Sequence, residues 1–253
     1  MKKYSLFFIY SMLAVIFITS CLGNSNQKIT IANQPGVVIK SGNDVKVQLS
    51  DNISIYSDRL TSGIDDGDCL LLKYTLDYGL DANSDSGRTA GFFTVDLVEA
   101  NGLPQYDIKN EIDTVNMFGN ERLITTIQQR HAFILDRLFL YTQHQVDSFR
   151  LQNFFEIAYN AKSEPQVTNN RRIYNLYLRV FRNTEVEEQK TNNPESIFIN
   201  VFNLSSIAQK EKALGNDSLL LKIRYVRSFN KDTTAVTNWA ETDLNLSLYP
   251  QRK

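Results

Sequence analysis

The residue types that carry most protein chemistry are sparse in this chain of 253 residues. It has two histidines, His131 and His144, and two cysteines, Cys21 and Cys69. It contains no GxxxxGK(S/T) phosphate loop, GxGxxG turn, HExxH helix, CxxC pair or GxSxG nucleophile turn, so its motifs give no support to common nucleotide, zinc, redox or hydrolase chemistry. A catalytic zinc usually takes three protein ligands that are rich in histidine. We therefore expect structural roles for both histidines and predict no catalytic residue, no metal and no cofactor.

The best match to a metal-binding loop is the stretch Asp81-Ala-Asn83-Ser-Asp85-Ser-Gly87. It places Asp, Asn and Asp at positions 1, 3 and 5, as a calcium loop does, but its glycine stands at position 7 instead of 6. Position 12 is Phe92 rather than the bidentate Glu of such a loop. We therefore interpret the stretch as a hairpin loop whose Asn and Asp side chains bond to their own backbone. Asp65-Asp66-Gly67-Asp68 is likewise interpreted as a tight turn before a strand.

Cys21 is the residue to which the sequence assigns a specific modification. A lysine-bearing start and the apolar run from Leu6 to Ile18 are typical of a secretory signal peptide. The run is too short to cross a bilayer, which takes about 20 residues as a helix. It ends in Ile18-Thr-Ser-Cys21, which resembles a bacterial lipobox; the alternative is an ordinary signal peptide with an incidental cysteine. The resemblance implies cleavage of residues 1–20, acyl chains on Cys21, and membrane lipid as its partner.

Cys69 is expected to be a buried, unreactive thiol. It opens an apolar run that continues through Leu72, and a free cysteine in such a run behaves as a small hydrophobic residue. A reactive thiolate needs an electropositive setting, whereas three aspartates lie just before Cys69. With Cys21 acylated, no second cysteine remains for an intramolecular disulfide.

Composition and charge favour a folded, β-rich body. The chain is 42% hydrophobic and its mean hydropathy is −0.29, which is typical of a globular protein rather than a disordered or multi-span membrane protein. It carries 12 Tyr, 15 Phe and 1 Trp against 11 Gly and 5 Pro, a bias toward residues that favour strands. With 27 basic and 28 acidic side chains, the net charge of −1 argues against a nucleic-acid partner.

The first half of the chain shows the pattern of short strands. Val45-Lys-Val-Gln-Leu49 alternates apolar and polar side chains, Ile53-Ser-Ile55 repeats the alternation, and Cys69 to Leu76 is a nearly continuous apolar run. Several short strands separated by polar, glycine-bearing turns predict a small OB-like barrel over residues 35–100. The polar residues 21–34 before it are interpreted as a lipidated tether.

The second half predicts a β-sandwich over residues 121–253, after an inter-domain segment at 101–120. Alternation returns from Phe155 onward and continues to Leu248, at a spacing typical of two packed sheets. Residues 121–145 fit a helix and strands equally well. One short helix is predicted at 205–214, because Ser205 or Asn203 can cap it and Gly215 can close it.

Three segments resemble the NigD-like lipoprotein family. Asp66-Gly-Asp-Cys-Leu-Leu-Leu-Lys-Tyr74 is similar to that family's Asp-Gly-x-Arg-Val-x-Val-x-Tyr strand, with Cys69 in place of the Arg. Leu178-Arg-Val-Phe-Arg-Asn183 is similar to its Leu-Arg-His-Asn segment, without the His, and Ile199 to Ile207 is similar to its Ser-Phe-Asp-Leu run. The resemblance implies an OB-like N-terminal domain and a C-terminal β-sandwich on an envelope lipoprotein. The family takes its name from a bacteriocin-immunity role, which fixes no catalytic residue.

We therefore expect a non-enzymatic, lipid-anchored protein of the bacterial envelope that acts through a protein- or glycan-binding surface, with bacteriocin immunity as one instance. Basic and aromatic residues interleave at Arg171-Arg-Ile-Tyr174 and Lys222-Ile-Arg-Tyr225. Ordinary strand alternation accounts for both segments, and an exposed Arg/Tyr face that contacts a protein or glycan is the alternative. Two other functions stay open. An envelope hydrolase would show a pocket of convergent acids, and a carbohydrate-handling accessory protein would show an aromatic platform, for example around Trp239.

The outer membrane is the expected location, with the periplasmic face preferred over the cell surface. Surface-exported lipoproteins of this kind of bacterium resemble one another in carrying acidic residues just after the acylated cysteine. The stretch Leu22-Gly-Asn-Ser-Asn-Gln27 carries none.

Overall fold

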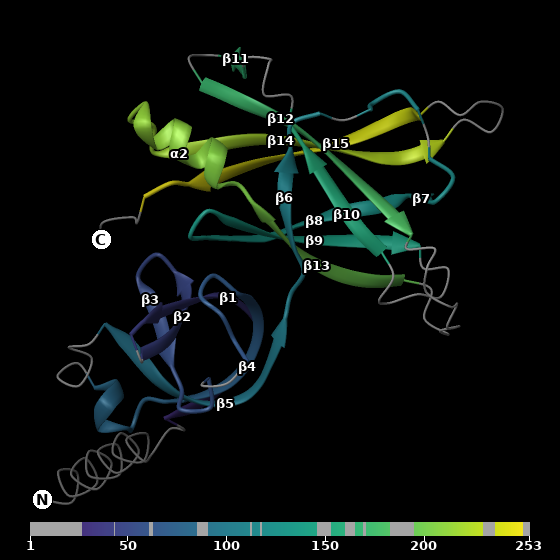
Figure 1. The fold of residues 1–253 in the computed structure, drawn as a ribbon. Helices are drawn as coiled ribbons and strands as arrows, with labels where there is room; N and C mark the ends of the chain where they lie inside the picture. Colours follow the sequence, from purple (N-terminus) through teal and green to yellow (C-terminus); the bar gives the residue numbers. More distant parts are fainter. Residues whose placement is uncertain are drawn as a thin grey trace, which may run out of the picture.

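The chain folds into two bodies built mainly of strands, a closed barrel and a larger sheet (Figure 1). This computed structural model describes residues 27–42, 44–60, 63–84, 91–111, 113–116, 118–145, 153–159, 165–168, 171–182, 195–229 and 236–249. The predicted signal peptide, Cys21 and the first part of the predicted tether lie outside the described residues. The mainly-β fold class predicted from composition and alternation is confirmed.

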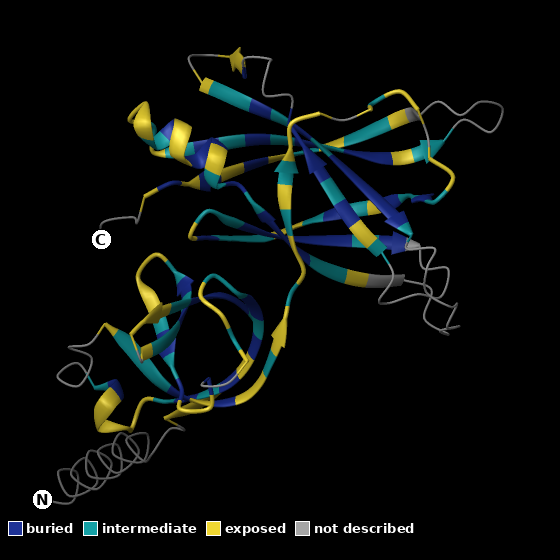
Figure 2. Cartoon of the chain, in the orientation of Figure 1, coloured by how far each residue is buried: buried dark blue, intermediate teal, exposed yellow. Residues whose placement is uncertain are grey.

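Five strands close the barrel in the order β1-β2-β3-β5-β4, and β4 pairs back onto β1. Neighbouring strands are antiparallel except β3 and β5, which run parallel. Buried positions alternate with more exposed ones along the strands, so one face of each strand lines the barrel core (Figure 2). The elements are β1 (Lys28–Ser41), β2 (Asp44–Ser50), β3 (Ile53–Tyr56), β4 (Cys69–Asp77), the short 3₁₀ helix η2 (Asp81–Asn83) and β5 (Phe92–Gly102).

β1 begins at Lys28, inside the stretch 21–34 that the sequence analysis interpreted as a tether. Its first residues, Ile29 to Ile31, pair with Tyr74 to Leu76 of β4. This pairing closes the barrel. It also satisfies backbone groups at the edge of β4 that would otherwise be exposed to water without a partner. A bulge after Ile31 then bends β1 so that its second part pairs with β2.

The larger sheet follows the order β15-β14-β12-β10-β6-β13-β9-β8, with β7 and β11 paired to β12. Strands from both halves of this path contribute to one core, and β8 packs against β14 and β15 from the other end of the path. The two layers predicted as a sandwich are therefore two parts of one strongly curled sheet. Its strands are β6 (Gln105–Lys109), β7 (Glu121–Arg122), β8 (Ile124–Ile134), β9 (Arg137–Gln145), β10 (Asn153–Ala158), β11 (Gln166–Thr168), β12 (Arg171–Arg182), β13 (Glu195–Asn203), β14 (Ser218–Phe229) and β15 (Val236–Ser247).

β6 joins the two layers and lies inside residues 101–120, which the sequence analysis interpreted as an inter-domain segment. It pairs in parallel with β10 on one side and with β13 on the other. Its Tyr106 and Ile108 pack against the core of the sheet. A strand of this length supplies only two inward side chains, so its alternation does not stand out between Pro104 and the polar residues that follow.

Residues 121–145, for which helix and strand stayed open, form β7, β8 and β9. β8 and β9 make a hairpin whose turn residues Leu135 and Asp136 both have positive φ. The helix predicted at 205–214 is confirmed as α2 (Ser205–Ala213). Gly215 follows α2 with a φ of +78°, the left-handed conformation that commonly ends helices.

A small apolar cluster joins the barrel to the larger sheet. Val37 and Cys69 of the barrel pack there with Ile134, Phe139 and Val201 of the larger sheet. Burial raises the pKa of the Cys69 thiol to about 12, so the thiol is uncharged at neutral pH and contributes packing. The burial of Cys69 predicted from the sequence is confirmed, and its side chain forms part of the contact between the two bodies.

Arg179 of β12 is a fully buried charge, with 1% of its surface exposed. Its Nε donates a hydrogen bond to Glu121 Oε1 at 2.6 Å, and its Nη2 donates to the second carboxylate oxygen. The backbone carbonyls of Asp113 and Asn116 accept further hydrogen bonds from the guanidinium, which lies 4.8 Å from the ring centre of Phe118. This bidentate, charge-assisted pair holds the segment before β8 against the outer face of β12.

We expect Glu121→Ala to lower the free energy of unfolding by about 3 kcal/mol or more, because it leaves the Arg179 guanidinium buried without its carboxylate. Glu241→Ala is the matched control, since Glu241 pairs with Lys222 on the exposed side of the larger sheet and should affect stability far less. Urea unfolding of the purified variants measures both effects. Equal losses in the two variants would contradict the role of the buried pair.

His144 of β9 is a core residue, as expected for a structural histidine. It is 1% exposed, its Nε2 lies 3.1 Å from Thr142 Oγ1, and its ring packs against Phe155 and Phe198. Burial lowers its pKa to about 4. The ring therefore stays neutral in the folded protein at pH values where the same ring in the unfolded chain binds a proton.

The folded protein should accordingly lose stability as the pH falls from 7 to 5. Over this range the unfolded state binds more protons than the folded state, and the pKa difference at His144 predicts a loss of about 2 kcal/mol. His144→Phe should remove this part of the pH dependence, whereas His131→Phe should retain it. Urea unfolding at pH 5, 6 and 7 checks the prediction, which fails when the His144 variant keeps the full slope.

Candidate functional site

Most of the residues singled out for chemistry in the sequence have structural surroundings or lie outside the described part of the chain. Cys21, the predicted acylation site, is among the latter. No helix in the described ranges has the length and apolar character needed to cross a membrane. The ring of His131 lies at the surface, with its Nδ1 3.0 Å from the carbonyl oxygen of Gln129. No three His, Cys, Asp or Glu side chains of the described residues gather as a metal site requires.

The loop that imitates a calcium site is held by its own asparagine. Asn83 is buried, its Nδ2 donates hydrogen bonds to the carbonyls of Asp77 and Thr94, both at 2.8 Å, and its Oδ1 accepts one from the Thr94 amide at 2.7 Å. The carboxamide thus ties the loop to both flanking strands, as expected of a hairpin loop. Asp85 and Gly87, the later residues of the proposed ligand set, lie outside the described residues.

The turn at residues 65–68 shows the same use of side chains. Asp68 Oδ2 accepts a hydrogen bond from the Asp65 amide at 2.7 Å, and Asp66 Oδ1 accepts one from the Lys40 amide at 2.8 Å. Gly67 has a φ of +83°, which a side chain would disfavour. The predicted tight turn before β4 is confirmed, and its carboxylates stabilise the backbone.

The outer side of β2, β3 and β5 carries a group of aromatic and polar side chains. Alternation sends Val47 and Ile55 into the core, and the residues between the inward positions therefore face outward. Gln48 lies opposite Ser54 in the antiparallel pair, and Ser54 lies opposite Phe92 in the parallel pair. We call this group the barrel face; its members, all partly exposed, are Lys46, Gln48, Ser54, Tyr56 and Phe92.

The barrel face combines ring surfaces with hydrogen-bonding groups. The rings of Tyr56 and Phe92 are 5.6 Å apart and tilted by 49°, and the ammonium of Lys46 lies 4.4 Å from the centre of the Phe92 ring. Beside them, the Ser54 hydroxyl donates a hydrogen bond to Gln48 Oε1 at 2.7 Å. Ring surfaces can stack on sugars or apolar groups, while the amide, hydroxyl and ammonium can meet hydroxyl or carboxylate groups. The strand 2–3 side is also where OB-folds bind oligosaccharides and oligonucleotides.

The basic and aromatic residues interleaved in β12 and β14 do not all lie at the surface. Tyr174 is fully buried, and its hydroxyl donates a hydrogen bond to Glu211 of α2, which also accepts one from Arg172 at 2.9 Å. Burial raises the pKa of Tyr174 to about 12. Tyr225 is also buried. Both tyrosines therefore face inward, as strand alternation predicts. The alternative of an exposed face that contains both is wrong, and α2 covers Tyr174.

A second aromatic contact lies on the outer side of β12, β14 and β15. Trp239 packs edge-on against Tyr177 at 5.3 Å, and Arg224 Nη1 donates a hydrogen bond to the Tyr177 hydroxyl at 3.3 Å. Lys222 pairs with Glu241 at 2.9 Å. The rings are only partly exposed and one presents its edge to the other. In this edge-on contact one ring covers part of the face of the other.

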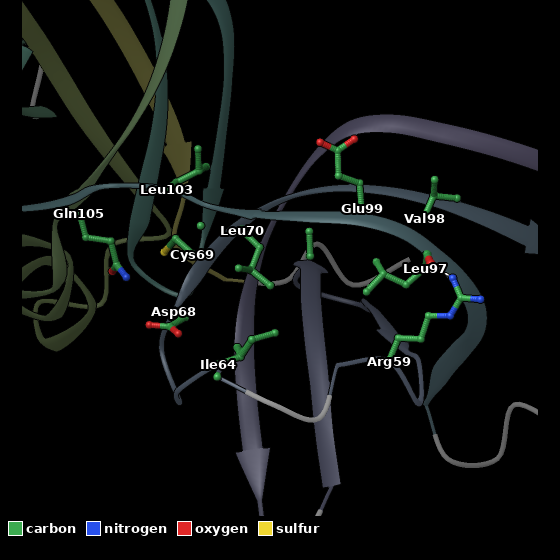
Figure 3. Close-up of a pocket in the computed structure, with 13 residues that line it drawn as sticks. Arg59, Ile64, Asp68, Cys69, Leu70, Leu97, Val98, Glu99, Leu103 and Gln105 are labelled. Carbon is green, nitrogen blue, oxygen red and sulfur yellow. Dashed lines mark hydrogen bonds between the residues drawn. The ribbon is translucent and has the colours of Figure 1, made fainter. Parts of the chain in front are cut away.

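A cavity of about 550 Å³ opens where the start of β4 meets the end of β5 (Figure 3). Leu70, Leu97 and Ile64 line it with apolar surface, and Arg59 and Glu99 supply charges at its border. The Arg59 guanidinium donates a hydrogen bond to the Leu97 carbonyl at 2.8 Å, and Glu99 accepts one from the Asn101 amide group at 2.7 Å. Among the described residues, the lining of this cavity includes no aromatic ring, whereas the barrel face carries two adjacent rings, so the barrel face is the better candidate for a ligand site.

Part of the barrel face could be predicted from the sequence. The alternation from Val45 to Leu49 places Lys46 and Gln48 on the water-facing side of a strand. Nothing in the sequence pattern indicates that Phe92 lies beside Tyr56, because that contact depends on the parallel pairing of β3 with β5. The buried partners Arg179 and Glu121 were also missed, since they lie 58 residues apart.

Comparison with known proteins places the barrel in a described family. Residues 24–101 match the family model described as "Lipoprotein OB domain". No curated protein matches the chain in sequence. Among solved structures, an uncharacterized protein from Parabacteroides merdae is 19% identical, with 88% of this chain and 100% of that chain covered and a TM-score of 0.71.

Two further structures extend the comparison. A lipoprotein candidate from Bacteroides fragilis is 10% identical, with 89% of this chain and 100% of that chain covered and a TM-score of 0.55. A NigD-like immunity protein from Bacteroides caccae is 14% identical over 86% of this chain and 98% of that chain, with a TM-score of 0.47. At such identities the likeness concerns the fold alone. The family match over residues 24–101 confirms the predicted OB-like barrel and the predicted lipoprotein resemblance.

Proposed function

We propose that the protein is held at the bacterial outer membrane by acyl chains on Cys21 and acts there by binding, not by catalysis. The observation that carries the proposal is the placement of the lipoprotein OB domain, which begins at residue 24, directly behind the lipobox-like Ile18-Thr-Ser-Cys21. One acyl chain binds a bilayer only marginally, whereas two or three hold a protein durably, since each buried methylene contributes about 0.8 kcal/mol. The absence of acidic residues from 22–27 favours the periplasmic face.

A binding role agrees with the use that the fold makes of its reactive side chains. Cys69 is packed between the two bodies, His144 is in the core of the larger sheet, and the carboxylate of Glu211 anchors α2. Each of these groups is buried and engaged in packing or hydrogen bonding. The partly exposed groups that remain for contact with another molecule include those of the barrel face.

We further propose a glycan as the ligand of the barrel face. Two adjacent rings with an amide, a hydroxyl and an ammonium beside them match the alternation of apolar ring faces and hydroxyl groups on a sugar. The net charge of −1 for the whole chain supports a glycan over a nucleic acid, which would require a basic surface. Bacteriocin immunity is a second candidate function, favoured by the resemblance of residues 66–74 to the NigD-like strand, and in that case the ligand would be a protein toxin.

Replacing the lipobox cysteine should release the protein from membranes. We expect Cys21→Ser to abolish incorporation of radiolabelled palmitate and to move most of the protein from the membrane fraction to the soluble fraction. Cys69→Ser is the control and should keep both the label and the membrane fraction, because that thiol is buried in the contact between the two bodies. Membrane retention of the Cys21 variant at the wild-type level would refute the anchor.

Ring removal on the barrel face should weaken glycan binding. On an array of neutral and uronic-acid-bearing oligosaccharides, we expect Tyr56→Ala and Phe92→Ala to reduce the affinity of the acylated protein about tenfold or more, since burying a ring of this size is worth about 1.5–3 kcal/mol. Trp239→Phe, which alters the other aromatic contact, should bind like the wild type. The proposal is wrong when the protein binds no oligosaccharide, or when only the Trp239 variant loses binding.

A further inference from the structure

One end of the barrel exposes three large side chains, two of them aliphatic and one aromatic. One lies in β1 where that strand pairs with the end of β4, and the other two lie in the turn that follows β4. Ile29 is 41% exposed, Tyr78 51% and Leu80 45%. Ile29 lies opposite Leu76 in the pairing of β1 with β4, two residues before Tyr78, and the Tyr78 ring packs edge-on against Phe93 at 6.4 Å. We call Ile29, Tyr78 and Leu80 the apolar rim of the barrel.

The rim has a fixed shape. Asp77 Oδ1 accepts a hydrogen bond from the Gly79 amide at 2.9 Å, and the Leu80 carbonyl accepts one from the Asn83 amide at 2.9 Å. The buried carboxamide of Asn83 then ties this turn to the backbone of Asp77 and Thr94. Because the turn is already ordered, docking of the rim on another surface would cost little additional conformational entropy.

The rim lies beside the point where the chain continues toward the predicted anchor. The Gln27 carbonyl accepts a hydrogen bond from the Tyr78 amide at 2.8 Å. Five residues, 22–26, separate Gln27 from Cys21, so even fully extended they reach no more than about 20 Å. Lys28, the next residue, forms an ion pair with Asp77 at 3.2 Å, which neutralises the charge of the Asp77 carboxylate. A short tether therefore keeps the rim close to any bilayer that holds Cys21.

The position of the rim within the fold points the same way. β4 begins at Cys69, in the contact with the larger sheet, and ends at Asp77 beside the rim. At about 3.3 Å per residue, the length of β4 between these two points, measured along the strand, is about 26 Å. The turn that carries η2 accordingly lies at the edge of the barrel remote from the larger sheet (Figure 1). With the rim toward a bilayer, the larger sheet extends away from it.

We infer that the apolar rim docks on the bilayer that holds Cys21, with Tyr78 at the headgroup level and Leu80 and Ile29 at the boundary with the acyl chains. Tyrosine is enriched at membrane–water interfaces because its ring is apolar and its hydroxyl is polar. Apolar side chains of peripheral proteins insert to the same boundary. This docking rests on the proposed acylation of Cys21, and it gives the protein a defined orientation with the larger sheet held outward.

Depth-dependent quenching in vesicles tests the docking. Trp239 is the single tryptophan, so Trp239→Phe provides a background in which Leu80→Trp places one reporter on the rim and Leu214→Trp places the control. Leu214 is 56% exposed and follows α2 on the larger sheet. The acylated proteins are reconstituted into vesicles of phosphatidylethanolamine and phosphatidylglycerol that contain acyl-brominated lipids. We expect the brominated lipids to lower the tryptophan emission of the rim reporter at least twofold and to leave the emission of the control unchanged.

The outcomes separate the docking from the anchor. Intact mass and flotation report whether Cys21 is acylated and the protein is vesicle-bound. Absence of acylation refutes the anchor and the docking together. An acylated, vesicle-bound protein in which the brominated lipids quench both reporters equally refutes the docking alone. The unaltered acylated chain supplies a second measurement that needs no substitution. Amide hydrogen exchange of residues 77–84 should be at least severalfold slower on vesicles than in the Cys21→Ser chain in solution. The amides of α2 should exchange at the same rate in both samples. Equal exchange rates at residues 77–84 would also overturn the docking.

Discussion

Pairing between the first residues of β1 and the last residues of β4 is the constraint from which the arrangement of the barrel follows. The register that sets Lys28 against Asp77 and Ile29 against Leu76 closes the barrel and leaves neither strand with a free edge there. The same register brings Gln27 beside Tyr78, so the chain leaves the barrel at the apolar rim. Since β4 starts in the contact with the larger sheet, this one strand connects the end of the barrel near Gln27 to the second body.

The larger sheet depends on a different device, the burial of charges that are fully paired. Arg179 and Glu121 bring the segment before β8 onto the outer face of β12, and Glu211 brings α2 onto β14 and β12 through Tyr174 and Arg172. Buried charges of this kind stabilise a fold only when both partners are present and hydrogen-bonded. Polar groups that could have served catalysis therefore specify which segments cover the sheet.

These constraints divide the barrel surface into regions with different chemistry. The end near Gln27 is apolar and ordered by Asn83, the side formed by β2, β3 and β5 carries rings and polar groups, and the region around Cys69 is covered by the larger sheet. Under the proposed function this separation matters. The membrane contact and the ligand contact then occupy different surfaces, so that a bound glycan need not displace the protein from the bilayer.

The local features of the fold could be predicted from the sequence. Alternation from Val45 to Leu49 and from Tyr174 to Val180 depends only on which face of a strand is buried, so it is readable from neighbouring residues. The helix at Ser205–Ala213 has Leu204 at its N-cap rather than the predicted Ser205 or Asn203, but Gly215 ends it as predicted. The lipobox-like sequence before Cys21 is local in the same sense. Such patterns sufficed for the barrel and the mainly-β class.

What only the tertiary structure decided is which segments lie side by side. β6 was too short to be recognised as the strand that joins the two layers, and β1 extends into residues interpreted as a tether because β4 offered it an edge. Tyr56 meets Phe92, and Glu121 meets Arg179, through pairings between distant parts of the chain. The alternation of apolar and polar residues along a strand indicates which side chains point inward, but it does not indicate which strand lies beside it. The candidate site can therefore be identified only when the long-range register is known.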